Sequence, residues 1–269
     1  MAEKYNYRIV YCKSSYLKHS VRSYYDLNLP VIFESPNTLD RLYIFLYKQI
    51  VLLCKLILKI SLFTFPKSKR FQMRILGLYF DTTNLYPDKV ESSNAFHGYF
   101  LSYSFIVDNI ILFNKFNNII FHDIHTLPKG SDAYGTKSNA IYISLRLGND
   151  YMSSNLSVCD KLYYEKSIDL AHKLNHGEFD NYCIFSDVPS KISEYLPREI
   201  LPKATIMDEG DIFMNMLSLS KANYVIIPNS TYALWAYLLE RDKVKILISP
   251  KKWSIDSSNN MEVSDGYKI

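Results

Sequence analysis

Residues 208–253 read DEGDIFMNMLSLSKANYVIIPNSTYALWAYLLERDKVKILISPKKW, and this stretch decides the fold. Apolar residues recur at helical spacing from Ile212 to Leu219, and residues 223–228 form a short apolar run that suits a buried strand. A second helix is predicted over residues 232–239, followed by another strand and a proline. This alternation of helices and strands predicts an α/β fold with parallel strands.

A turn of three small polar residues, Asn229, Ser230 and Thr231, separates the first strand from the second helix. In an open α/β sheet, ligands bind at the carboxyl ends of the strands. The N–H groups at a helix start favour an anion such as phosphate. Ser and Thr are also ordinary helix caps, so the spacing alone leaves a phosphate-binding turn and a plain cap both open.

The composition indicates a protein with a large core. Of its 269 residues 48% are hydrophobic, and 23 Tyr with 15 Phe supply large surfaces for burial. The net charge of +4 is too small to indicate nucleic-acid binding. The cysteines form no CxxC pair, and residues 1–10 lack the apolar segment of a signal peptide. We therefore expect a cytoplasmic protein with reduced thiols that binds no nucleic acid.

Two histidine pairs raise the question of a metal site. His122 and His125 lie three apart on a predicted strand or turn, so their rings point different ways. His172 and His176 lie four apart on a predicted helix, without the glutamate of an HExxH motif. Neither pair comes with the further ligands that a metal site needs, so we predict no metal and no cofactor.

Residues 38–65 form a long apolar stretch in which Arg41, Lys48, Lys55 and Lys59 share one narrow face at about 100° per residue. A spanning helix would carry the lysines through the bilayer, at roughly 2.5–3.5 kcal/mol each near its centre. We therefore predict an amphipathic basic helix that does not span a membrane. Two interpretations stay open: the helix packs on the protein core, or it lies on the inner surface of the plasma membrane.

Turn residues predict a division into two lobes. Pro128, Gly130 and Gly135 lie in a polar segment that suits a linker, which separates residues 1–130 from residues 131–269. In the second lobe, helical segments alternate with strands that are predicted over residues 139–145, 182–186, 204–207 and 223–228. This order predicts a doubly wound parallel sheet.

Charged residues follow two of these strands. Arg146 and Asp150 come after the first, and Asp187 comes after the second. Arg can bind two phosphate oxygens at once, and an acidic residue at a strand end can contact a base or ribose. A purely structural Arg–Asp pair stays an alternative. With residues 229–231, these side chains predict one polar crevice.

In this order the segments resemble the motifs of the α-1,2-fucosyltransferases of glycosyltransferase family 11. Those motifs are H-x-R-R-G-D-Y, Y-Y-x-K-A-I, F-S-D-D, N-S-T-F-S-W-W and P-x-x-W. The corresponding segments here are SLRLGNDY at 144–151, YYEKSI at 163–168, FSD at 185–187, NSTYALW at 229–235 and PKKW at 250–253. Ser144, Leu147 and Val188 depart from the family's His, second Arg and second Asp.

The resemblance implies a GT-B-like fold of two Rossmann-like lobes, with the GDP-sugar bound by residues 131–269 and the acceptor side formed by residues 1–130. It implies an inverting, metal-independent transfer of L-fucose from GDP-L-fucose to the 2-hydroxyl of a galactoside. The acceptor would be part of a bacterial surface glycan such as O-antigen, in some members lipid-linked at the inner membrane face.

The resemblance also implies roles for individual residues. Arg146 would bind the GDP phosphates and stabilise the leaving charge, and residues 229–231 would bind the same donor. Asp187 would lie near the nucleoside, and Asp150 would orient the acceptor or act as a base.

Members of the family begin with a strand and a glycine-rich G-G-L-G-N-Q turn, and residues 8–30 resemble the region after that turn. We therefore expect an incomplete N-terminal lobe. This leaves a second hypothesis open, a catalytically impaired nucleotide-sugar or glycan-binding remnant of the family.

Overall fold

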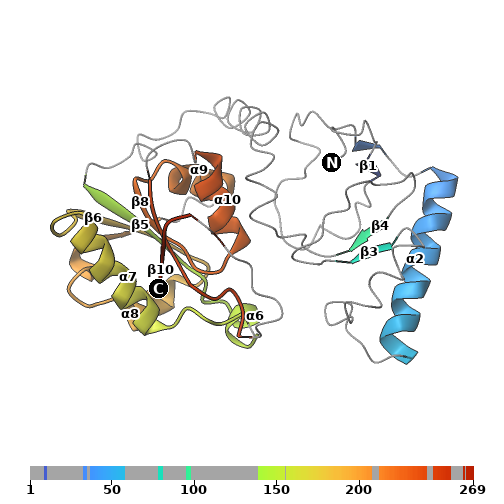
Figure 1. The fold of residues 1–269 in the computed structure, drawn as a ribbon, viewed down its shortest axis with the longest axis horizontal. Coiled ribbons are helices and arrows are strands. Elements are labelled where there is room, and N and C mark those ends of the chain that lie inside the picture. The colour runs from blue at the N-terminus through green and yellow to red at the C-terminus, as the bar shows by residue number, and fades with distance from the viewer. Residues whose placement is uncertain are drawn as a thin grey trace. The chain divides into compact units, whose positions relative to one another are not determined.

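The computed structural model describes residues 9–10, 33–34, 37–57, 78–80, 95–97, 139–154, 156–207, 212–240, 245–255, 263 and 265–269. The chain divides into two compact units, residues 1–123 and 124–269 (Figure 1). The lobe boundary predicted near residue 130 stays a prediction, and residue 130 lies outside the described residues.

In its described residues, the N-terminal unit contains two short parallel strand pairs and one long helix. Strand β1 (Ile9–Val10) pairs with β2 (Phe33–Glu34), and β3 (Leu78–Phe80) pairs with β4 (Ala95–His97). Helix α2 spans Thr38–Ile57, so the predicted helix is present up to residue 57, and residues 58–65 lie outside the described residues.

A reciprocal cap fixes the start of α2. The side chain of Asn37 accepts a hydrogen bond from the Asp40 amide at 2.9 Å, and the side chain of Asp40 accepts one from the Asn37 amide at 3.0 Å. This arrangement satisfies two N–H groups that a helix start otherwise leaves without partners. Among the described residues, no helix has the length and apolar character needed to cross a membrane.

The C-terminal unit is built on a six-stranded sheet in the order β10-β9-β8-β5-β6-β7, and all its pairs are parallel. The strands are β5 (Ala140–Leu145), β6 (Asn181–Ser186), β7 (Ala204–Ile206), β8 (Tyr224–Ile226), β9 (Ile246–Ser249) and β10 (Tyr267–Lys268). The chain adds β6 and β7 on one side of β5, then returns to add β8, β9 and β10 on the other. The predicted α/β class with a doubly wound parallel sheet is confirmed.

Helices cover both faces of this sheet. The described α-helices of this unit are α6 (Asn149–Met152), α7 (Lys161–Leu174), α8 (Ile192–Tyr195), α9 (Ile212–Ser220) and α10 (Thr231–Leu239). Figure 1 shows α7 and α8 on one side of the sheet, with α9 and α10 on the other. Every residue of β5 is buried, as expected for a central strand with helices on both faces.

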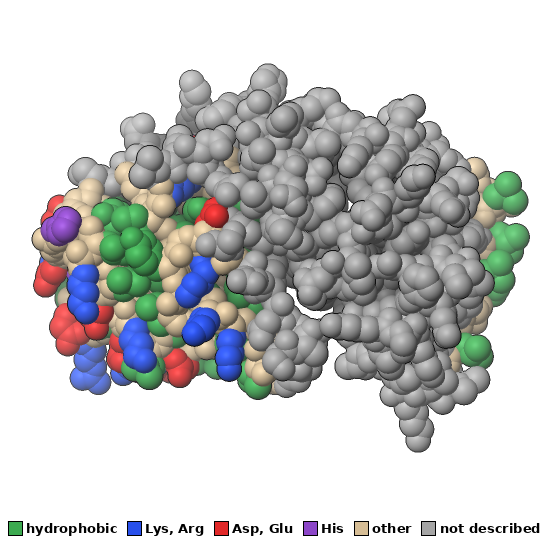
Figure 2. All heavy atoms as spheres, viewed as in Figure 1, with side chains coloured by type: hydrophobic (Ala, Val, Ile, Leu, Met, Phe, Trp, Pro, Cys, Tyr) green, Lys and Arg blue, Asp and Glu red, His purple; other side chains and the backbone are tan. Residues whose placement is uncertain are grey.

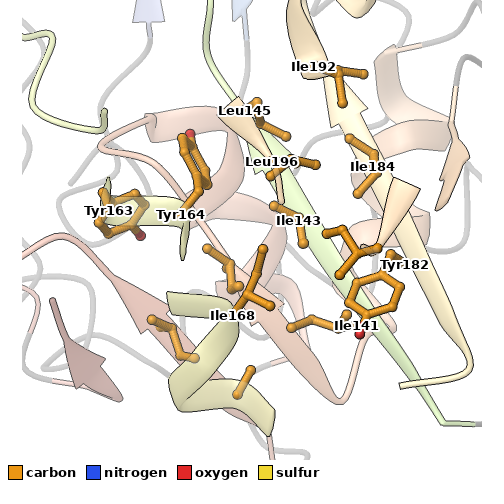
Figure 3. Close-up of a cluster of buried hydrophobic side chains, with 14 of the residues drawn as sticks. Ile141, Ile143, Leu145, Tyr163, Tyr164, Ile168, Tyr182, Ile184, Ile192 and Leu196 are labelled. Atoms are coloured by element: carbon orange, nitrogen blue, oxygen red, sulfur yellow. The ribbon is translucent and has the colours of Figure 1, made fainter. Parts of the chain in front are cut away.

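The main core lies between β5, β6 and α7. Ile141 and Ile143 of β5 gather with Tyr164 and Ile168 of α7 in one buried cluster (Figure 3). The start of α7 is fixed by Asp160, whose side chain accepts a hydrogen bond from the Tyr163 amide at 2.8 Å. Because burial of a large apolar side chain contributes roughly 1.5–3 kcal/mol, this cluster anchors the strand that leads to Arg146.

Candidate functional site

The polar residues predicted to converge do follow neighbouring strands. Strand β5 lies between β6 and β8, and it is also the strand at which the direction of the chain reverses. Leu145 pairs with Ser186, so Arg146 and Asp187 each lie one residue beyond a paired position. Such a switch point in a doubly wound sheet is where ligands bind.

Arg146 is held between two carboxylates. Its Nη2 donates to Oδ2 of Asp150 at 2.6 Å, and its Nε lies 3.2 Å from Oδ2 of Asp187. The Arg146 side chain is 41% exposed, so ligands in solution can reach it. A guanidinium carries more N–H groups than these two pairs use, so Arg146 can bind an additional acceptor.

Asp187 fixes the backbone of the loop that carries Arg146. Its Oδ1 accepts a hydrogen bond from the Leu147 amide at 2.6 Å, and its Oδ2 accepts one from the Gly148 amide at 3.1 Å. The sequence resemblance placed Asp187 near a nucleoside. In the observed contacts its carboxylate orients the arginine and its loop, and the nucleoside contact stays a prediction.

Gly148 permits the close approach of both carboxylates. A Cβ atom on this residue would lie 2.7 Å from Oδ1 of Asp150 and 2.9 Å from Oδ2 of Asp187. Gly148 also begins α6, because its carbonyl accepts hydrogen bonds from the amides of Tyr151 and Met152. A larger residue would therefore force the carboxylates to shift, which is easy for the exposed Asp150 side chain and harder for Asp187, because Asp187 also accepts two backbone hydrogen bonds.

Asp150 lies at the exposed end of this group. The hydrogen bond from Arg146, together with the arginine's charge, lowers the pKa of Asp150 below its ordinary value of 3.8. A carboxylate with a lowered pKa is a weak base near neutral pH. The observed contact of Asp150 is its ion pair with Arg146, and its two expected roles, acceptor orientation and base chemistry, stay predictions.

Asn229 is committed to contacts inside the protein. Its Oδ1 accepts a hydrogen bond from the Tyr151 hydroxyl at 2.5 Å, and its Nδ2 donates to the carbonyls of Leu156 and Trp253, each at 2.7 Å. The residue is only 8% exposed. In this arrangement Asn229 joins three chain segments, and its expected contact with the donor stays a prediction.

Two buried tyrosines complete this internal network. Tyr163 donates a hydrogen bond to the Ile227 carbonyl at 2.5 Å, which ties α7 to the end of β8. Burial raises the pKa of the Tyr151 hydroxyl, and it raises the pKa of the nearby Cys159 thiol to about 12. Burial also raises the pKa of the Tyr163 hydroxyl. The two tyrosine hydroxyls and the Cys159 thiol therefore stay protonated at neutral pH and can donate hydrogen bonds.

Ser230 and Thr231 stand at the start of α10. Within this described helix, the Ser230 side chain makes no capping hydrogen bond, although its backbone occupies the N-cap position. Both residues are partly exposed. Ser230 therefore does not make the side-chain hydrogen bond of an ordinary helix cap. The first N–H groups of any helix have no partner within that helix, which leaves this end suited to an anion.

The histidine pairs provide no metal site in the part of the chain that the structure describes, where no group of three potential ligands gathers. His172 is within 2.7 Å of the Tyr182 hydroxyl and packs against Phe179. His122 and His125 lie outside the described residues.

Sequence reasoning missed Tyr151 as a residue of the site. It follows Asp150 directly, and it links the arginine loop to Asn229 and thus to the start of α10. Its aromatic ring beside the polar residues Asn149 and Asp150 was the available signal, because a tyrosine that is buried usually finds a partner for its hydroxyl.

No family model matches the chain, and no curated protein matches it. Among solved structures, a crystal structure of POFUT1 in complex with GDP is similar over 52% of this chain and 49% of that chain, with 11% sequence identity and a TM-score of 0.34. The similarity spans about half of each chain, and at this TM-score we infer nothing from it.

Proposed function

We propose that the C-terminal unit binds the diphosphate of a GDP-sugar at the switch point between β5 and β8. The observation that carries this proposal is the position of Arg146. Asp150 and Asp187 hold its side chain just beyond the end of β5. The neighbouring strand β8 leads into α10. Ile143 pairs with Ile226, so Arg146 and Asn229 each lie three residues beyond a paired position. Arg146 and the turn before α10 therefore follow neighbouring strands at the same end of the sheet.

The chemistry of the two groups is complementary to a diphosphate. A guanidinium binds phosphate oxygens through parallel hydrogen bonds, and a helix N-terminus offers N–H groups with a partial positive charge. The hydroxyls of Ser230 and Thr231 can add donors at the same place. These groups would also stabilise the negative charge that develops on a leaving diphosphate, without a metal ion.

The proposed reaction is transfer of L-fucose from GDP-L-fucose to the 2-hydroxyl of a galactoside, in the cytoplasm and on a surface glycan. The order of the motifs along the C-terminal unit supports this choice of sugar and acceptor. In this proposal the units form the two lobes of a GT-B enzyme, with the acceptor bound on the N-terminal side. Asp187 and Asn229 act as positioning residues.

A second candidate is a protein of the same ancestry that binds the nucleotide sugar without transferring the sugar. Leu147 favours this candidate, because it occupies the position of the family's second arginine and is fully buried in the core. A buried leucine cannot bind phosphate. Val188 likewise replaces the family's second acidic residue.

Calorimetry with GDP and GDP-L-fucose, beside a transfer assay with galactosides, separates these candidates. Binding with transfer supports the enzyme, and binding without transfer supports the second candidate. Arg146→Ala should weaken GDP binding at least about tenfold, because a charge-assisted hydrogen bond contributes about 1.5–3 kcal/mol. The matched control is Arg198→Ala, an exposed arginine of the same unit. Wild-type protein that binds neither nucleotide would refute both candidates.

A further inference from the structure

The described surface of α2 carries large apolar side chains in solvent. They are Leu39, Leu42, Phe45, Leu46, Leu52 and Leu53, each between 48% and 75% exposed. Figure 2 shows hydrophobic side chains along the edge where Figure 1 labels α2, whereas charges of both signs intermix over the C-terminal unit. Six large apolar side chains exposed on one helix indicate a binding surface.

These side chains share one side of the helix. At about 100° per residue, an arc of about 140° contains all of them, which is typical of a helix that lies in an interface. Arg41 and Lys48 lie at one flank of this arc, and both are exposed. Lys55 continues the same stripe in the sequence of the helix.

The charges of α2 identify the kind of partner. Arg41, Lys48 and Lys55 are its basic residues, and its one acidic residue, Asp40, accepts a hydrogen bond from the Asn37 amide in the cap. A second copy of the helix packed on this face would bring cations near cations. An anionic lipid surface complements both features, because acyl chains take up the apolar side chains and phosphates attract the basic ones.

We propose that α2 docks in the plane of a membrane surface that contains anionic phospholipids. Its leucines and Phe45 enter the boundary between headgroups and acyl chains. The long stems of Arg41 and Lys48 let their charged ends stay among the phosphates. This inference does not depend on the proposed nucleotide site, whose residues all belong to the C-terminal unit.

Flotation of the full chain with lipid vesicles tests the proposal. Vesicles of phosphatidylcholine mixed with phosphatidylglycerol should bind the protein, and binding should weaken as salt is added. The double variant Leu42→Glu/Leu46→Glu should lose binding. The matched control is Leu156→Glu/Leu162→Glu, which places the same charges on leucines of similar exposure in the other unit and should bind normally.

The cationic flank has a separate test. Arg41→Gln/Lys48→Gln should weaken binding to the mixed vesicles by roughly fivefold for each cation removed, with little effect on phosphatidylcholine alone. The proposal would be overturned if the wild type bound both kinds of vesicle equally or bound neither. It would also be overturned if the Leu42→Glu/Leu46→Glu variant bound the mixed vesicles as well as the wild type does. A dimer in sedimentation velocity that this variant makes monomeric would assign the face to a second copy and overturn it as well.

Discussion

Replacement of Asp187 by Asn tests how the arginine loop is held. The carboxylate accepts hydrogen bonds from the Leu147 and Gly148 amides at 2.6 and 3.1 Å and pairs with Arg146 at 3.2 Å. An asparagine keeps one acceptor oxygen, while its NH2 group would face an N–H group. Hydrogen bonds to a charged group contribute about 1.5–3 kcal/mol each, and the partial exposure of Asp187 lets water replace part of this.

We therefore expect Asp187→Asn to lower the free energy of unfolding by about 1–3 kcal/mol. In thermal unfolding followed by circular dichroism, each kcal/mol should lower Tm by about 2–4 °C for a unit of this size. The matched control is Asp169→Asn on the exposed face of α7, which should leave Tm unchanged. If Asp187→Asn unfolds at the wild-type temperature, the carboxylate does not hold the loop and the reasoning is refuted.

Three further changes probe the surroundings of the site. Tyr151→Phe should lower the free energy of unfolding in urea by about 1–2 kcal/mol, because it removes the 2.5 Å hydrogen bond to the buried Oδ1 of Asn229. An unchanged unfolding midpoint would contradict this prediction. Arg146 lowers the pKa of Asp150, so the pair stabilises the fold fully above the ordinary value of 3.8 and this contribution is lost as pH falls through the lowered pKa. The pH dependence of Tm below about pH 4 should therefore be weaker in Asp150→Asn than in the wild type. Gly266 has φ +72°, and a Cβ there would lie 2.3 Å from a backbone oxygen of β9. Gly266→Ala should therefore lower the free energy of unfolding by about 1–3 kcal/mol in the same urea assay. An unchanged midpoint would contradict this prediction.

The sequence was sufficient to predict the elements with clear apolar patterns. The strand predicted over residues 139–145 is present as β5, because its continuous apolar run suits a strand buried on both faces, and the helical segment expected between it and the next strand is present as α7. The order of strands and helices then led to the parallel sheet, since right-handed crossovers leave few alternatives. Arg146 and Asp187 were expected at one edge of the sheet for the same reason, and their side chains are in contact.

Two features depended on tertiary contacts that no local pattern encodes. Asn229 was expected to bind the donor because it is a small polar residue in a turn. Its observed partners, Tyr151 and the Leu156 and Trp253 carbonyls, are distant in sequence and could not be predicted from the turn. Strand β10 was missed as well, because it has only two residues and forms by pairing with β9.

The central claim is that Arg146 binds a diphosphate at the switch point of the sheet. The most direct measurement is a calorimetric comparison of guanosine, GMP and GDP on the wild type and on Arg146→Ala. We predict that affinity for the wild type rises with each phosphate, and that most of this increase disappears in the variant while guanosine binds both proteins equally. Equal affinity of the wild type for GDP and guanosine, or an undiminished increase in the variant, would contradict the claim.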